Sequence, residues 1–246
     1  MKASAVFWLP KAGTSADEYE DACAADPDRG YFAIADGASE SSFARQWAEL
    51  LVQQFVRAPA HRRRRWVSWL RPLQQQWLDQ VGSRPLPWYA EMKLKQGAFA
   101  AFLGLVIRTG LCFPRMLWRA VAVGDSCLFH LGSGNLRTTF PLTRSAEFGT
   151  SPWLVGSRSP PEHMLDREKL RVRGGCCKPG DRFYLMTDAL ACWFLREYEA
   201  DRKPWEAIDR FLDGPDAEKA FADWISDLRD KGQMRNDDVT LLVVQV

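Results

Sequence analysis

Acidic side chains recur in this 246-residue chain where short apolar runs begin or end. These sites are Asp36 after YFAIA, Asp125 after AVAVG, Asp188 after FYLMT, Asp237-Asp238 before VTLLVVQV, and Glu20-Asp21 before a further possible strand. A single Asp in such a place often caps a turn or a helix. Several carboxylates gathered at one sheet edge repel each other and need a cation. Since no His or Cys accompanies them at ligand spacing, hard oxygen ligands predict Mg²⁺ or Mn²⁺.

The elements that must position these carboxylates come as runs of strands and runs of helices. Alternation and apolar runs predict strands over 4–9, 31–35, 98–107, 116–123, 127–131, 136–140, 182–187 and 239–246. Helical spacing predicts helices over 43–55, 61–81, 189–199 and 204–230, the first capped by Ser39, Ser41 or Ser42 and the last broken at Gly214-Pro215. This order favours an α+β layered domain over a parallel βαβ domain. Residues 141–168 show no period and are predicted to form a flap.

Composition bounds the class of protein. The chain is 46% apolar and 26% charged, with a net charge of +2, which is typical of a globular protein and gives no global field for nucleic acid or an anionic membrane. No run of eighteen apolar residues and no clear signal peptide is present, so we expect no membrane association and a cytoplasmic location. The six cysteines are then expected to be reduced thiols.

Five short motifs in order carry a resemblance to a known family. They are E-D-A at 20–22, A-D-G at 35–37, V-G-D-S at 123–126, T-D-A-L at 187–190 and D-D-V-T at 237–240. In this order they resemble the type 2C metal-dependent Ser/Thr protein phosphatases, and ADGASESSFARQW resembles a bacterial branch. The resemblance covers residues 17–246. It implies one catalytic domain over 1–246, with the αββα fold: two antiparallel sheets face to face and helices outside.

The resemblance also implies a role for each matching residue. The implied metal ligands are Glu20, Asp21, Asp36, Gly37, Asp125, Asp188 and Asp237, of which Asp36, Asp188 and Asp237 are the implied catalytic residues. Asp36 would bridge two Mn²⁺ or Mg²⁺ ions, with the carbonyl of Gly37 completing one shell, and Asp125 would help hold a third, weaker ion. Hydroxide formed between the two metals would hydrolyse phosphoserine or phosphothreonine on a protein. A Ser/Thr kinase of the same pathway is one candidate partner.

Three departures from the family pattern leave a second function open. The family's phosphate-binding Arg falls here near Ala16, and Lys11 is the nearest preceding basic residue. Ala38-Ser39 replaces a glycine pair, and Ala189 replaces a glycine. Losing a bidentate phosphate clamp weakens phosphate binding. The alternative is therefore a catalytically weak or inactive module that binds phosphoproteins.

Two other patterns suggest different chemistry. Cys176 and Arg182 have the C-x5-R spacing of Cys-dependent phosphatases, but that loop must open a helix, and this segment leads into a strand. Residues 61–65, H-R-R-R-R, lie close to Trp66, Trp69 and Trp77 and could bind nucleic acid. The simpler interpretation is a helix with a solvated basic face and tryptophans packed inward, so nucleic acid is not the expected partner.

Overall fold

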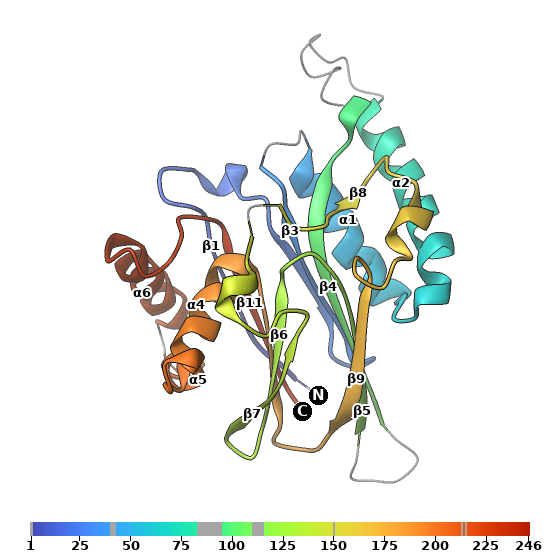
Figure 1. Ribbon diagram of the computed structural model, residues 1–246. Helices are drawn as coiled ribbons and strands as arrows, with labels where there is room; N and C mark the ends of the chain where they lie inside the picture. The colour runs from blue at the N-terminus through green and yellow to red at the C-terminus, as the bar shows by residue number, and fades with distance from the viewer. Residues whose placement is uncertain are drawn as a thin grey trace.

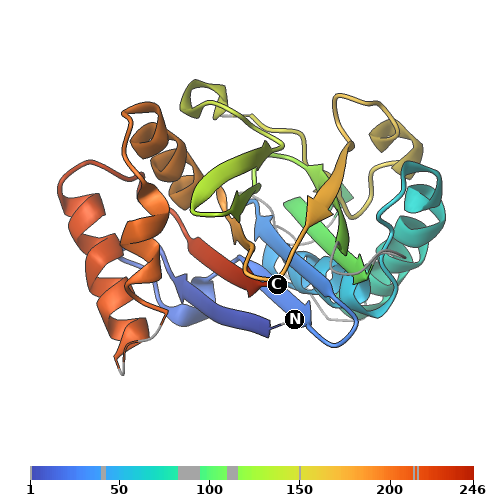
Figure 2. The same cartoon turned by 90° about the horizontal axis from the view of Figure 1, so that it is seen from below.

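Two antiparallel sheets pack face to face, and helices cover the outer face of each (Figures 1 and 2). The computed structural model describes residues 2–39, 43–82, 95–109, 116–149, 151–212, 214 and 216–246. Within these ranges one sheet has the strand order β1-β11-β10-β6-β7, and the other has the order β2-β3-β4-β5-β9, with β8 paired to β4. The predicted α+β class and αββα layering are confirmed.

The strands and helices have the following bounds. The strands are β1 (Lys2–Leu9), β2 (Ala22–Asp26), β3 (Tyr31–Gly37), β4 (Phe99–Thr109), β5 (Met116–Val123), β6 (Cys127–Gly132), β7 (Asn135–Phe140), β8 (Val155–Gly156), β9 (Arg171–Cys177), β10 (Arg182–Met186) and β11 (Val239–Gln245). The α-helices are α1 (Ala44–Arg57), α2 (Trp66–Gly82), α4 (Asp188–Glu199), α5 (Pro204–Asp209) and α6 (Ala217–Asp230). The 3-10 helices are η1 (Ala16–Glu18), η2 (Arg63–Arg65), η3 (Ser145–Glu147) and η4 (Pro161–Met164).

Period-two alternation builds the four layers. On β3, Phe32 and Ile34 enter the core between the two sheets, while Ala33 and Ala35 face the helices. Burial on both faces explains why β3, β4 and β11 are almost wholly apolar. The carboxylates beyond the ends of these strands therefore stand on a rigid frame.

The helical layer over the six-stranded sheet buries the tryptophans of the basic segment. Trp66, Trp69 and Trp77 are buried in one cluster with α1 and the sheet. Trp69 lies 5.8 Å, centroid to centroid, from Phe102 of β4. These rings are therefore not available to stack on nucleic-acid bases.

No helix in the described ranges has the length and apolar character that crossing a membrane requires.

Some elements differ from the sequence-based expectation. The strand β9 was not predicted, because its sequence RVRGGCC is polar and glycine-containing, and it lies at a sheet edge where one face is exposed. The N-cap position of α1 is Phe43, with φ of 66°, so the prediction of Ser39 as the cap is wrong. Ser41 and Ser42 lie outside the described residues. The helical segment over 204–230 is divided as predicted: α5 ends at Asp209 and α6 begins at Ala217, on either side of the expected break.

Candidate functional site

Three carboxylates that are far apart in the sequence meet at one edge of the sandwich. One carboxylate oxygen from each of Asp36, Asp125 and Asp188 lies within 4.8 Å of the other two. Asp36 lies near the end of β3, Asp125 lies in the turn from β5 to β6, and Asp188 is the first residue of α4. The edge therefore collects one acidic group from the six-stranded sheet, one from the helix that follows β10 of the other sheet, and one from a turn that connects the two sheets. The three residues line a cavity of about 620 Å³, together with Gly37 and Asp237.

Two glycines allow the backbone to approach closely enough to form this cluster. A Cβ at Gly37 would lie 2.7 Å from the carbonyl oxygen of Glu20 and 3.1 Å from the Cβ of Ala44. At Gly124 the φ is +97°, and a Cβ would lie 2.6 Å from the Cβ of Ala101. Both positions exclude larger residues: a side chain at Gly37 would push the end of β3 away from Glu20 and α1, and one at Gly124 would push the turn that carries Asp125 away from β4.

Burial and mutual repulsion disfavour the ionised forms of these carboxyl groups. Burial raises the pKa of Asp36 well above its usual range, and the charges of Asp21 and Asp188 raise it further. Burial first, and then the charge of Asp188, raises the pKa of Asp125 to about 7. A bound cation would offset both effects and restore the ionised forms, so the arrangement suits a cation.

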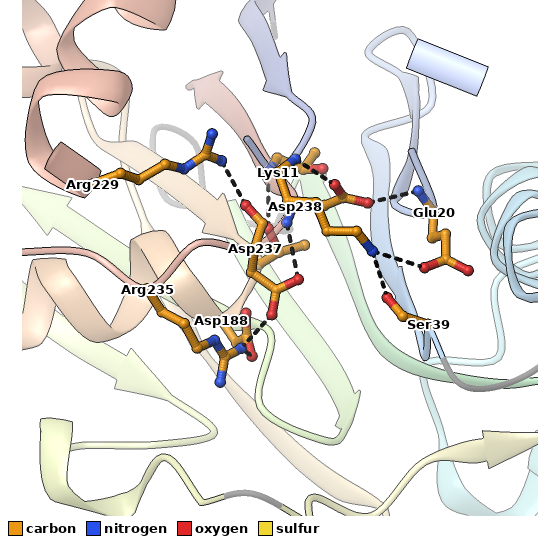
Figure 3. A network of polar contacts seen from close by, with 10 residues as sticks. Lys11, Glu20, Ser39, Asp188, Arg229, Arg235, Asp237 and Asp238 are labelled. Carbon is orange, nitrogen blue, oxygen red and sulfur yellow. Dashed lines mark hydrogen bonds and ion pairs between the residues drawn. The ribbon is translucent and has the colours of Figure 1, made fainter. Parts of the chain in front are cut away.

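The guanidinium of Arg235 partly neutralises the cluster. It forms ion pairs with Asp188 and with Oδ2 of Asp237, the second at 2.9 Å (Figure 3). Burial raises the pKa of Asp188, and the neighbouring charge of Arg235 opposes that shift. Oδ1 of Asp188 is buried and has no hydrogen-bond partner among the described residues. The arginine therefore leaves part of the acidic charge uncompensated.

A second set of polar contacts fixes the backbone segments around the cluster (Figure 3). The carboxylate of Asp238 accepts hydrogen bonds from the backbone N–H groups of Lys11 and Glu20, both at 2.8 Å. Arg229 donates to the carbonyl oxygens of Asp237, at 2.6 Å, and Pro10, at 2.9 Å. Asp238 thus links the start of β11 to the segments on either side of η1. Its carboxylate oxygens accept backbone hydrogen bonds, which gives this residue a structural role.

The carboxylate of Asp21 lies behind the cluster in a buried hydrogen-bond chain. Oγ1 of Thr240 donates to its Oδ2 at 2.6 Å, and the hydroxyl of Tyr19 contacts the same Thr240 oxygen. The backbone N–H of Thr240 in turn donates to Oγ1 of Thr187, the residue before Asp188, at 2.9 Å. Burial raises the pKa of Asp21 well above its usual range, and its Oδ1 has no hydrogen-bond partner among the described residues.

The structure separates the predicted site residues into groups. Asp36, Gly37, Asp125, Asp188 and Asp237 line one cavity. Asp21 is buried behind them, with its charge acting on Asp36. Glu20 instead lines a neighbouring cavity, where its Oε2 lies 3.5 Å from Nζ of Lys11.

Sequence reasoning assigned no site role to Ser39 or Arg235, both of which line the main cavity. The one available signal was the position of Arg235 two residues before Asp237. Lys11, noted only as the nearest basic residue, reaches the rim: its Nζ donates to Oγ of Ser39 at 2.9 Å. Ala16, at the place of the absent arginine, begins η1.

The C-x5-R spacing does not form a phosphate-binding loop. Cys176 lies in β9 and Arg182 begins β10, so no helix begins between them. The guanidinium of Arg182 pairs with Oδ2 of Asp209 at 2.6 Å. This geometry excludes the Cys-dependent phosphate chemistry that the spacing suggested.

The donor set fits a hard divalent cation. The converging side-chain donors of Asp36, Asp125 and Asp188 are all carboxylate oxygens, and Oδ1 of Asp188 is buried without a hydrogen-bond partner among the described residues. Mg²⁺ and Mn²⁺ prefer oxygen ligands of this kind. Zn²⁺ sites instead use His and Cys, and neither lines the described part of the cavity.

Comparison with known proteins assigns the fold. No protein-family model matches the chain, and no curated protein sequence matches it. Among solved structures, the phosphatase MsPP from Mycobacterium smegmatis, of the PPM Ser/Thr type, is similar at 17% identity over 98% of this chain and 97% of that one, with a TM-score of 0.57. The catalytic domain of the phosphatase PstP with two manganese ions is similar at 16% identity over 98% and 96%, with a TM-score of 0.58. The photosystem II phosphatase PBCP is similar at 16% identity over 98% and 97%, with a TM-score of 0.62. The chain therefore has the fold of the PPM, or type 2C, Ser/Thr phosphatases, as its ordered acidic motifs predict.

Proposed function

We propose that this protein is a metal-dependent phosphatase that hydrolyses phosphoserine or phosphothreonine on other proteins. The observation that carries the proposal is the meeting of Asp36, Asp125 and Asp188 in one cavity of a PPM-type fold. The proposal includes a single catalytic domain, a flap over 141–168, and a bacterial, cytoplasmic signalling role.

The residues of this site would hold two Mn²⁺ or Mg²⁺ ions and a third ion that binds more weakly. Asp36, Asp188 and Asp237 would be the principal ligands, Asp125 would serve the weaker ion, and the carbonyl of Gly37 with Glu20 or Asp21 would complete the set. Bound ions supply Lewis acidity toward a phosphoryl group and an activated water near neutral pH. Glu20 could serve as a ligand only if its carboxylate left Lys11 and bound a cation in its place.

Two basic groups would orient the substrate phosphate. The ammonium of Lys11 lies at the rim of the cavity beside Ser39, from which it can donate to a phosphate oxygen. Arg235, once a cation takes over the charge of Asp188 and Asp237, presents a guanidinium to the same cavity. A guanidinium can form two parallel hydrogen bonds to a phosphate. These groups compensate for the arginine that is absent near Ala16.

The surroundings of the cavity support a protein substrate. Trp153, which is 54% exposed, lines an adjoining cavity that also includes Asp125. The ammonium of Lys169 lies 4.2 Å from the centroid of its ring. An exposed indole with a neighbouring cation offers a surface for the chain that flanks a phosphorylated residue. A kinase that carries phosphothreonine is one such substrate.

The test is turnover of p-nitrophenyl phosphate and of a phosphothreonine peptide, each with Mn²⁺ and with EDTA. We expect metal-dependent release of phosphate from both, and a loss of more than about 100-fold in Asp36→Asn, since even residues that only support metal ligands cost about 10–100-fold. Asp28→Asn is the matched control, because Asp28 is exposed in the turn between β2 and β3.

The alternative of a regulatory module gives a different result. A module that binds phosphoproteins without hydrolysing them would retain the phosphothreonine peptide and release no phosphate in Mn²⁺ or Mg²⁺. Calorimetry with Mn²⁺ would then separate two cases. Binding by the wild type but not by Asp36→Asn would support the module, and no binding by either would refute the metal site itself.

A further inference from the structure

A second cavity, with the opposite charge, lies at the other end of the six-stranded sheet. Its volume is about 540 Å³. Its basic lining residues are Arg62, Arg108 and Arg119. They come from the segment before η2, from the end of β4 and from the start of β5, whereas Asp125 follows the far end of β5 (Figure 1). The cavity is therefore separate from the acidic cluster.

Strand register explains why these side chains share one face. Leu117 pairs with Arg108 of β4 and with Cys176 of β9, and Arg119 pairs with Gly174 of β9. The helix α1 packs mainly on β2, β3 and β4, which leaves this part of β5 and β9 open. The side chain of Leu117 is consequently 56% exposed beside the arginines.

The positive charge in this cavity has no acidic counterpart among the lining residues. None of the described residues forms an ion pair with Arg62, Arg108 or Arg119, and the one side-chain hydrogen bond from these guanidinium groups to a described residue is that of Arg108 to the hydroxyl of Tyr31, at 3.4 Å. The residues that join β4 to β5 in the sequence, 110–115, contain no Asp or Glu. Like charges that converge without partners favour the binding of a counterion.

Two further features keep the space beside the arginines open and polar. A Cβ at Gly174 would lie 2.9 Å from the carbonyl oxygen of Trp118, which is too close, and 3.9 Å from Nε of Arg119; the close approach of β5 therefore requires glycine here, and no side chain fills the space beside that guanidinium. His61 also lines the cavity; it is 9% exposed, and its Nδ1 has no hydrogen-bond partner among the described residues. Burial, and then the charge of Arg108, lowers the pKa of His61, which keeps the imidazole neutral.

We propose that this cavity binds a small phosphate-bearing molecule that also carries an apolar or planar group. Guanidinium groups recognise phosphate by paired hydrogen bonds, and three of them here surround one space. The volume lies in the range of about 300–1,000 Å³ that is usual for small-molecule sites. Val106 and Leu117 supply an apolar wall next to the arginines. A concave space surrounded from three segments fits a compact ligand better than an extended acidic peptide.

The test uses the full chain, with EDTA present, and two probes, pyrophosphate and ATP. Without a cation the acidic cluster repels anions, so binding measured by calorimetry reports on the basic cavity. We expect saturable binding with a Kd of about 1 mM or tighter. Binding of both probes should weaken at least tenfold in the double variant Arg108→Gln/Arg119→Gln. Arg210→Gln is the matched control, because Arg210 is an exposed arginine next to α5.

The exposed thiol of Cys176 gives a second, local measurement. Cys176 lines the cavity, so a bound probe should slow its reaction with a thiol reagent, followed by mass spectrometry of its peptide. The partly buried Cys192, on α4, is the internal reference.

Three results would overturn the proposal: no saturable binding of either probe up to about 10 mM, binding that the double variant retains, or binding that leaves the Cys176 reaction rate unchanged. Binding of an acidic peptide in the absence of any binding of pyrophosphate or ATP would also overturn it, in favour of a protein partner.

Discussion

Two clusters of like charge occupy opposite ends of the same sheet, and they differ in burial. The acidic cluster has Asp125 and Asp188 buried and Asp36 partly buried, with Arg235 as its internal counter-charge. In the basic cluster Arg62, Arg108 and Arg119 are all exposed. Water screens the second set, so its repulsion costs little. Water screens the acidic cluster poorly. We therefore expect this cluster to bind an ion more strongly than the basic cluster and to lower the free energy of unfolding more when no ion is bound.

The largest expected effect is the stabilisation of the protein by Mn²⁺ and its dependence on pH. The pKa values of Asp36 and Asp125 are raised in the folded state, that of Asp125 to about 7. The folded protein therefore favours the protonated carboxyl groups. Their contribution to the free energy of unfolding is complete below about pH 4, where the unfolded chain is also protonated, and it is lost as the pH rises through the folded-state pKa. We expect the metal-free protein to lose stability between pH 5 and pH 8.

If the proposed site binds Mn²⁺, the ion at a hundredfold excess over its Kd would add about 2.7 kcal/mol to the free energy of unfolding. For a chain of this size that corresponds to a rise in Tm of about 5–10 °C. We expect the rise at pH 8 and a smaller one at pH 5, where protons compete for the same carboxylates. Differential scanning fluorimetry with EDTA or Mn²⁺ checks this. An equal rise in Asp36→Asn would show that the metal binds elsewhere.

The next effect concerns Arg235, which forms ion pairs with Asp188 and Asp237 in the absence of a cation. Removing the guanidinium in Arg235→Gln removes a competitor, so Mn²⁺ should bind about tenfold more tightly, equivalent to about 1.4 kcal/mol. Arg235→Lys keeps the charge and should change the affinity less. Calorimetric titration with Mn²⁺ measures both. Weaker binding in Arg235→Gln would mean that the arginine holds the carboxylates in place instead.

Much of the fold follows from features that are local in the sequence. The apolar runs that end at Asp36, Asp125 and Asp188 predicted three strands, whereas the αββα layering was implied by the family resemblance that the ordered motifs carry. The strand β9 escaped because an edge strand with polar residues and glycines carries little alternation. The position of Phe43 at the start of α1 escaped because a left-handed residue depends on how the preceding segment approaches.

The candidate site was less accessible to sequence reasoning than the fold. The positions of the acidic residues at strand ends predicted the cluster, but nothing in the sequence predicted which basic residues would pair with them. Arg235 reaches Asp188 across 47 residues, and Lys11 reaches Ser39 across 28. Such contacts depend on the direction of long side chains in the folded protein. The arginines of the basic cavity likewise come from separate segments, which only strand register brings together.

The smallest expected effect compares the two clusters directly, by removing one charge from each in metal-free protein at pH 8. Asp125→Asn removes a buried charge from among like charges and should therefore stabilise the fold. The gain should be only about 1 kcal/mol, because the buried amide still needs hydrogen-bond partners. Arg119→Gln removes an exposed charge and should change the free energy of unfolding by less than about 0.5 kcal/mol. Urea unfolding of the two variants beside the wild type measures both values. Equal effects would contradict the view that burial separates the clusters, and a destabilised Asp125→Asn would mean that its carboxylate, even without a metal, holds the turn between β5 and β6.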